Sequence, residues 1–145
     1  MQIEDKKKEI AKYLRDLNLG SNEKKIAAAY MLGILGKNNK KVIAALTNAM
    51  ENEIEEVRNW AAISLGELGE QKKNTIPILI EILQKEESEL VKSLAAAILG
   101  DIGEKMPQII PALKNAINDE NWRVREQAVY AIERLEQNKN KILQK

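Results

Sequence analysis

One segment pattern is repeated four times along this chain. The copies begin at residues 24, 57, 91 and 124, so successive copies are 33, 34 and 33 residues apart. Each copy carries a basic second residue and alanine at its fifth position, and three copies end in a Leu-Gly or Met-Leu-Gly sequence. A period of this length with two helical stretches per copy is typical of a solenoid of helical hairpins, in which each unit buries its apolar face against its neighbours.

The apolar spacing predicts eight helices in four hairpins. The first helices are expected at 3–18, 40–50, 74–84 and 107–117, and the second helices at 22–35, 53–68, 89–102 and 120–136. We expect a single domain over 1–145, with repeats at about 3–36, 37–69, 70–103 and 104–137. Residues 138–145 are interpreted as a tail or as the stub of a fifth repeat, because Ile142-Leu143 lies 33 residues after Ile109-Ile110.

Helix boundaries are indicated by capping residues. An N-cap side chain that accepts the first free N–H groups is expected at Ser21, Asn52, Ser88 and Asp119. A C-cap with positive φ, which glycine adopts at low cost, is expected at Gly20, Gly36, Gly69 and Gly103. Pro77 and Pro111 are expected in the first turn of a helix, where a missing N–H costs least, and Pro107 indicates that the seventh helix starts late or bends.

The sequence of the second copy carries a family resemblance. It reads Val57-Arg58-x-x-Ala61-Ala62-x-x-Leu65-Gly66-x-Leu68-Gly69, followed by Ile76-Pro77-x-Leu79. This pattern resembles the HEAT-repeat family in its short variant, named for phycobilisome lyases, and the resemblance extends over about residues 3–137. It implies an all-α, right-handed α-solenoid of four HEAT-like helical hairpins. It implies no single function, since such repeats serve many purposes.

The positions on the second helices have different expected roles. Small residues in the hairpin core allow two helix axes to approach closely, and this column is Ala28, Ala61, Ala95 and Ala128. A flanking column, Ala29, Ala62, Ala96 and Val129, is expected to pack on the neighbouring repeat, as is Trp60. A basic column, Lys25, Arg58, Lys92 and Arg125, is interpreted as a ladder in which each cation reaches an acid or carbonyl near the neighbouring inter-helix turn. Phosphate binding by this column is disfavoured because acidic residues are interspersed with it.

The face opposite the core is the predicted partner-binding surface. In solenoids of this kind the second helices usually line the concave side, where exposed aromatic and apolar side chains often mark a binding site. The predicted concave row comprises Ile26, Tyr30, Asn59, Ile63, Ser93, Ala97, Trp122, Arg123, Glu126 and Tyr130. The alternative is that curvature buries these side chains between adjacent helices. For Trp122, packing at the end of the solenoid is favoured over a role in binding.

Composition excludes several kinds of chemistry. The chain has no cysteine and no histidine, so it lacks thiolate zinc sites, a cysteine nucleophile and histidine-dependent catalysis or iron binding. We expect no catalytic, cofactor-binding or metal-binding residues. With 23 basic and 22 acidic residues the net charge is +1, which disfavours nucleic acid as a partner. No signal peptide and no apolar stretch of about 20 residues is present, so we expect a cytoplasmic protein with no membrane partner.

These observations favour a non-catalytic scaffold that binds another protein or a peptide on its concave surface. The alternatives are a subunit of a chromophore lyase-like enzyme, to which the family resemblance points, and a weak nucleic-acid-binding solenoid. Self-association through the C-terminal end is a further alternative, in which Ile142 and Leu143 complete the stack of a neighbouring copy.

Overall fold

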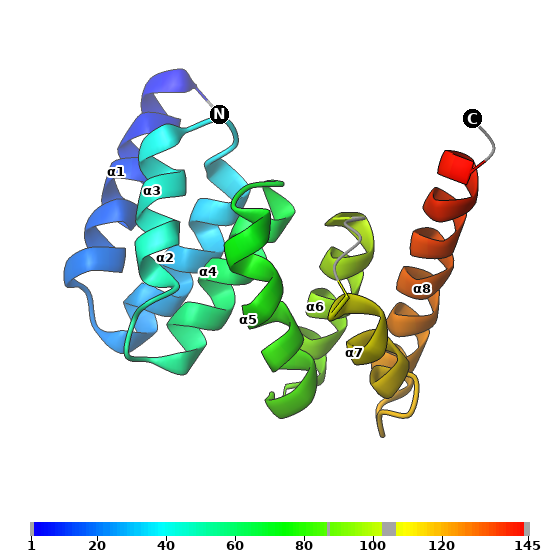
Figure 1. Ribbon diagram of the computed structural model, residues 1–145. Coiled ribbons are helices and arrows are strands. Elements are labelled where there is room, and N and C mark those ends of the chain that lie inside the picture. Colours follow the sequence, from blue (N-terminus) through cyan, green and yellow to red (C-terminus); the bar gives the residue numbers. More distant parts are fainter. Residues whose placement is uncertain (1, 87, 103–106, 144–145) are drawn as a thin grey trace. The chain divides into compact units, whose positions relative to one another are not determined.

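The computed structural model describes residues 2–86, 88–102 and 107–143. Over these residues the chain forms eight α-helices and no strand, which confirms the all-α prediction (Figure 1). No helix in the described ranges is both long and apolar enough to span a membrane. The helices are α1 (Ile3–Leu19), α2 (Asn22–Leu35), α3 (Lys40–Ala49), α4 (Glu55–Glu67), α5 (Lys72–Lys85), α6 (Glu89–Ile102), α7 (Ile109–Ala116) and α8 (Trp122–Leu143).

Most predicted helix boundaries lie within one residue of these bounds, and five differ by two residues or more: the starts of α4, α5, α7 and α8 and the end of α8. Both α4 and α8 begin two residues later than predicted, at Glu55 and Trp122. The seventh helix begins after Pro107, at Ile109. The eighth continues to Leu143, so residues 138–143 belong to α8. The side chains of Ile142 and Leu143 lie outside the described part of the chain.

The chain divides into two compact units, residues 1–75 and 76–145. In the first unit, α1 and α2 form one hairpin and α3 and α4 form the next, with α1 packed beside α3 and α2 beside α4. Figure 1 shows α3 in front of α2, with α1 at the outer edge of this unit. The core of this unit is aliphatic, and its fully buried side chains include Leu32, Val42, Leu46 and Leu65.

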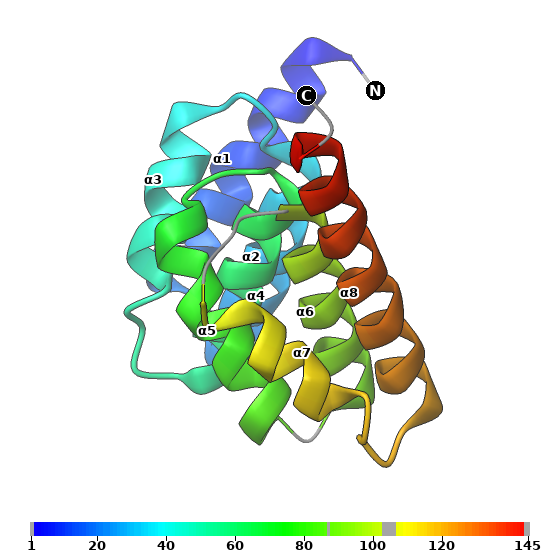
Figure 2. The same cartoon turned by 45° about the vertical axis from the view of Figure 1, so that its right-hand side comes forward.

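In the second unit, α6 and α8 lie side by side, as α2 and α4 do in the first, and α7 packs against α8 (Figure 2). The side chains of Leu79, Leu99, Ile109 and Leu113 are fully buried in this unit.

Glycine permits the close approach of the second helices in both units. A Cβ added to Gly33 of α2 would lie 2.6 Å from the Cβ of Ser64 in α4. A Cβ added to Gly100 of α6 would lie 2.8 Å from the Cα of Ala131 in α8. In addition, the Ser64 hydroxyl donates a buried hydrogen bond of 2.7 Å to the carbonyl oxygen of Ala29. The two units therefore use equivalent repeat positions for the same contact.

The N-cap predictions are right for two helices and wrong for two. Ser21 accepts from the Lys24 N–H at the start of α2, and Ser88 accepts from the Val91 N–H at the start of α6. Asn52 and Asp119 lie too early to cap α4 and α8. Ile54 occupies the N-cap of α4 with no side-chain bond. At the start of α8, Asn121 accepts from the N–H groups of Arg123 and Val124.

The predicted positive φ is found at only one of the described cap glycines. Gly69 has φ +71°, whereas Gly20 and Gly36 have φ values of −77° and −93°. At these two positions glycine provides space: a Cβ would lie 2.6 Å from the carbonyl oxygens of Asp16 and Leu32, respectively. Gly103 lies outside the described residues.

The two prolines expected in first turns also differ. Pro111 is the third residue of α7, as predicted. Pro77 lies inside α5, because that helix begins at Lys72 rather than near residue 74. Pro77 has no N–H to donate to the preceding turn, so α5 lacks one helical hydrogen bond at this point.

Candidate protein-binding surface

The second helices bury one face and expose another. The alanine column of the hairpin core, Ala28, Ala61, Ala95 and Ala128, is fully buried. In the flanking column Ala29, Ala62 and Ala96 are fully buried, whereas Val129 is 39% exposed on α8. Trp60 is half-buried, and its ring packs edge-on against Tyr30 of the neighbouring helix with ring centroids 5.4 Å apart. The prediction that Trp60 packs on the neighbouring repeat is therefore confirmed.

Three members of the basic column bind the inter-helix turns. Arg58 Nη1 donates to the carbonyl oxygen of Asn52 at 2.6 Å. Arg125 Nη1 donates to the carbonyl oxygens of Asp119 and Glu120, each at 2.9 Å. Lys92 reaches the turn of the next hairpin, where its Nζ lies 2.8 Å from Asp119 Oδ2. The Lys92 contact agrees with the predicted ladder, whereas Arg58 and Arg125 bond to the turn before their own helix rather than to the neighbouring turn. All three contacts occupy cations that would otherwise be candidates for phosphate binding.

Asp119 joins this ladder to the start of α8. Its Oδ2 accepts from Lys92, while its Oδ1 accepts from the Asn121 N–H at 2.9 Å. Burial raises the pKa of Asp119, but the two hydrogen bonds and the charges of Lys92 and Arg125 outweigh this effect, and the pKa lies below its ordinary value. The carboxylate therefore stays ionised and holds the turn between α7 and α8.

The predicted concave row divides into exposed and buried members. Tyr30 and Tyr130, which occupy the same repeat position, are 48% and 54% exposed. Ile26, Ser93 and Ala97 are half-buried, whereas Asn59 and Ile63 are buried. The last two side chains therefore present little surface to a partner.

The N-terminal end of α8 carries a second exposed aromatic group. Trp122 is 57% exposed, so the favoured interpretation of this side chain as packed at the end of the solenoid is wrong. The guanidinium of Arg123 lies over the indole ring, 5.3 Å from its centroid. Arg123 and Glu126 are exposed on the same helix, two turns and one turn before Tyr130, respectively. In the second unit, α8 thus supplies a patch of Trp122, Arg123, Glu126 and Tyr130.

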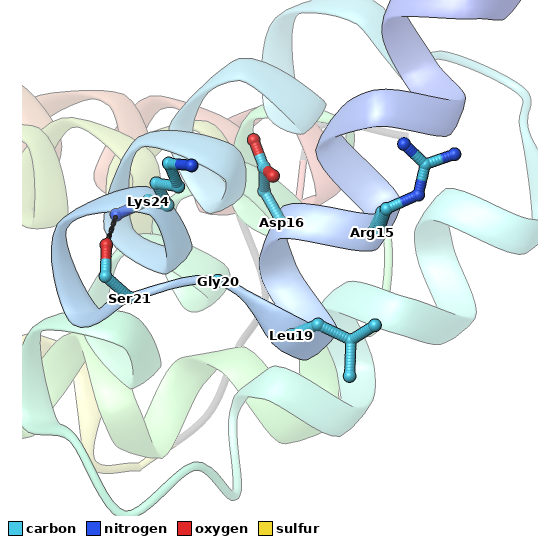
Figure 3. A pocket seen from close by; sticks show the side chains of 6 residues that line it. All are labelled: Arg15, Asp16, Leu19, Gly20, Ser21 and Lys24. Carbon is cyan, nitrogen blue, oxygen red and sulfur yellow. Dashed lines mark hydrogen bonds between the residues drawn. The ribbon is translucent and has the colours of Figure 1, made fainter.

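A separate open pocket of about 280 Å³ lies between the end of α1 and the start of α2. It is lined by Arg15, Asp16, Leu19, Gly20, Ser21 and Lys24 (Figure 3). Figure 3 shows Ser21 bonded to the N–H of Lys24, so its hydroxyl oxygen serves the helix cap. This pocket is not predicted from the sequence, in which Gly20 and Ser21 are assigned only to helix caps.

Comparisons with known proteins agree with this architecture. The family model of HEAT repeats matches residues 10–93 and 76–143. No curated protein matches the sequence. Among solved structures, the chain is similar to the complex of CpcE and CpcF of phycocyanin lyase from Nostoc sp. PCC7120, at 20% identity and a TM-score of 0.57. This similarity covers 88% of the present chain and 65% of that chain, and at this identity it shows the fold alone. From its four hairpins, its equivalent helix contacts and the match to the family model over most of its length, we conclude that the chain belongs to the HEAT-repeat family.

Proposed function

We propose that the chain is a non-catalytic scaffold that binds a partner protein or peptide through the exposed aromatic face of its second helices. The observation that carries this proposal is the exposure of Tyr30 and Tyr130, at one repeat position in two different units. A tyrosine ring buries a large area on binding, loses little rotamer freedom and keeps a hydroxyl for hydrogen bonding. Such side chains are common anchors at protein interfaces.

The neighbouring residues support this function in different ways. In the first unit, Trp60 packs edge-on against Tyr30 and limits the orientations of its ring. In the second unit, Trp122, Arg123 and Glu126 extend the exposed surface around Tyr130. Ile26, Ser93 and Ala97 are half-buried and contribute contact area at the edges. We assign Asn59 and Ile63, which are buried, to support of the surface rather than to contact.

The proposal is tested by capture of partners from a native lysate with wild-type protein and a Tyr30→Ala/Tyr130→Ala variant. The matched control is Ile3→Ala/Leu19→Ala, which removes two exposed apolar side chains outside the concave row. Circular dichroism first shows that all three proteins are folded. A partner retained by wild type and control and lost from the tyrosine variant supports the proposal. Equal capture by all three, or loss with the control variant alone, would contradict it.

A second candidate is a subunit of a two-protein lyase, which the similarity to the CpcE and CpcF complex favours. The measurement that separates it from a scaffold is visible absorption, since a protein acting on a pigment changes the spectrum. Purified chain mixed with phycocyanin is compared with phycocyanin alone. A time-dependent change in the visible spectrum of phycocyanin would favour the lyase function over the scaffold function. Binding of duplex DNA that weakens steeply with salt would instead favour a nucleic-acid-binding solenoid.

A further inference from the structure

In each unit, the second helix of the later hairpin packs on the second helix of the earlier hairpin. This contact, α4 on α2 and α8 on α6, uses the same repeat positions in both units. In α4, these positions include Ser64, which fits against Gly33 and bonds to Ala29 of α2. In α8, they include Ala131, which fits against Gly100 of α6, and Arg134, which pairs with Asp101. These contacts define the face through which the second helix of one hairpin packs on the second helix of the preceding hairpin.

The corresponding face of α2 is apolar and open. The repeat offsets place Ala27, Met31 and Ile34 on it, and we call these three residues the open α2 face. Ile34 is 58% exposed, Ala27 is exposed and Met31 is half-buried. At the position of Ile34, the other three second helices carry the charged residues Glu67, Asp101 and Arg134. An exposed isoleucine at this position is therefore specific to α2.

The opposite end of the repeat series is closed to the same kind of stacking. On α8, Val129 and Glu133 stand where α6 carries Ala96 and Gly100. Both side chains are exposed, and Glu126 and Glu136 lie on the same helix. At Gly33 and Gly100 the neighbouring helix is too close to leave room for a Cβ. Glu133 occupies the equivalent position of α8, so its side chain prevents a further helix from packing as closely there. Polar end surfaces of this type are how solenoids terminate. We therefore do not expect α8 of one copy to pack on the open α2 face of another copy in a head-to-tail stack.

We propose that the open α2 face binds the same face of a second copy of this chain, with the two α2 helices antiparallel. At 100° per residue, Glu23, Ala27, Met31 and Ile34 share one side of α2, and exposed Lys37 follows just after the helix ends. In the antiparallel arrangement, small Ala27 meets large Ile34 of the other copy, and the two Met31 side chains meet near the twofold axis. Glu23 of each copy then lies opposite Lys37 of the other, so the stripe is complementary to itself in shape and in charge.

The size of this contact determines the strength of the association. One helix from each copy buries less than the about 1,200 Å² at which stable specific interfaces begin, which places the contact among the weak ones. A twofold dimer uses one patch on each copy and closes on itself. We therefore expect a monomer–dimer equilibrium that depends on protein concentration and does not extend to longer assemblies.

The first test is sedimentation velocity of the full chain over a concentration series. Wild type is expected to shift from the 16.4 kDa of a single chain toward twice that mass as concentration rises. Ile34→Glu is expected to stay monomeric throughout, whereas the control Val129→Glu, an equally polar change on α8, is expected to dimerise like wild type. A wild-type chain that remains monomeric at its highest soluble concentration would overturn the proposal and leave the face to a different protein. Loss of dimer with Val129→Glu but not with Ile34→Glu would overturn it as well.

The second test uses the absence of cysteine from the chain. A disulfide requires Cβ atoms about 3.5–4.5 Å apart, so a single cysteine near the twofold axis links two copies and one far from it does not. Met31→Cys is expected to form a covalent dimer under mild oxidation, while Val129→Cys remains a monomer. The charge contact is tested by Glu23→Lys, which is expected to weaken the dimer, and by Glu23→Lys/Lys37→Glu, which is expected to restore it. Equal cross-linking of the two cysteine variants, or no restoration by the double variant, would contradict the antiparallel arrangement.

Discussion

At the scale of single residues, glycine has two distinct physical roles in this chain. Gly33 and Gly100 lie where two second helices touch, and each would place a Cβ inside the neighbouring helix. Gly69 has no neighbour within 4 Å of an added Cβ, but its φ of +71° is one that side chains other than glycine rarely adopt. Space is required at the first two positions and backbone freedom at the third.

The change Gly100→Ala tests the first role. Alanine normally stabilises a helix by about 0.5–1 kcal/mol relative to glycine. Here its methyl group would lie 2.8 Å from Ala131 Cα, so overpacking is expected to reverse the sign and cost about 1–3 kcal/mol. Urea denaturation measures the difference, and a more stable Gly100→Ala protein would show that the helices separate without cost.

The sequence predicts the positive φ of Gly69 correctly, but the same prediction is wrong for Gly20 and Gly36. Positive φ was predicted at Gly20 and Gly36 because glycines after helices often adopt it, but their backbones remain at negative φ and the chain passes too close for a side chain. The requirement for space depends on a residue elsewhere in the fold, such as Val42 for Gly36. Local sequence patterns carry no information on that distance.

At the scale of elements, each described turn before α4, α6 and α8 contains the same hydrogen bond. Side-chain oxygens of Asn52, Glu86 and Asp119 accept from the backbone N–H two residues later. Two of the three turns then supply an N-cap side chain, Ser88 or Asn121, one residue before the helix begins. The sequence prediction placed Asn52 and Asp119 at the N-cap because it recognised their oxygens but not the two-residue turn that they close.

The N-cap of α8 is predicted to contribute measurably to stability. Asn121→Ala removes the acceptor of the Arg123 and Val124 N–H groups and is expected to cost about 0.5–2 kcal/mol. The matched variant Asn121→Ser keeps an acceptor and is expected to lose less. Thermal unfolding followed by circular dichroism ranks the three proteins, and equal stability of the alanine and serine variants would argue against a capping role.

The partly buried ion pair between Lys92 and Asp119 predicts a dependence of stability on pH. The pKa of Asp119 is lower in the folded protein than the about 3.9 of an unfolded aspartate. Its contribution is therefore fully present above the unfolded pKa and is lost as pH falls through the folded pKa. We expect Asp119→Asn to be less stable than wild type by about 1.5–3 kcal/mol at neutral pH, since bonds to charged groups are lost.

This difference is expected to shrink in acid, where the wild-type carboxyl is also uncharged. Denaturation at a series of pH values measures it. Exposed Glu81, which pairs with Lys85 on the surface of α5, provides the control, because exposed pairs of this kind contribute little. A gap between Asp119→Asn and wild type that does not depend on pH would show that the charge of Asp119 is not what stabilises the turn.

At the scale of the whole molecule, stability is expected to be distributed by repeat. In solenoids each repeat contacts only its neighbours, so damage stays close to its origin. Gly100→Ala is expected to speed amide hydrogen exchange in α6 and α8 and to leave α1 to α4 close to wild type. Gly33→Ala provides the reciprocal experiment, with faster exchange in α2 and α4. Faster exchange throughout the chain in either variant would indicate that the chain unfolds as one cooperative unit.

The architecture was predictable from the sequence to a much greater extent than the surface. The repeat period fixes which residues are equivalent, and it correctly predicts the buried alanine column and a basic column that bonds to inter-helix turns. It does not distinguish the next turn, which Lys92 reaches, from the turn before the same helix, to which Arg58 and Arg125 bond. Tyr30, Ile63 and Tyr130 are also equivalent by period, yet Ile63 is buried and the tyrosines are half exposed. Exposure depends on what packs beside each position, which differs from one repeat to another.

The turn position shared by Asn52, Glu86 and Asp119 has a consequence for how such proteins diverge. An amide, a longer acid and a shorter acid all present an oxygen to the same N–H, so natural selection can exchange them while the loop keeps its shape. The three repeats thus share a side-chain acceptor at this position rather than one amino acid. Chimaeras that exchange these turns between repeats are therefore expected to fold, because each turn keeps its hydrogen-bond acceptor.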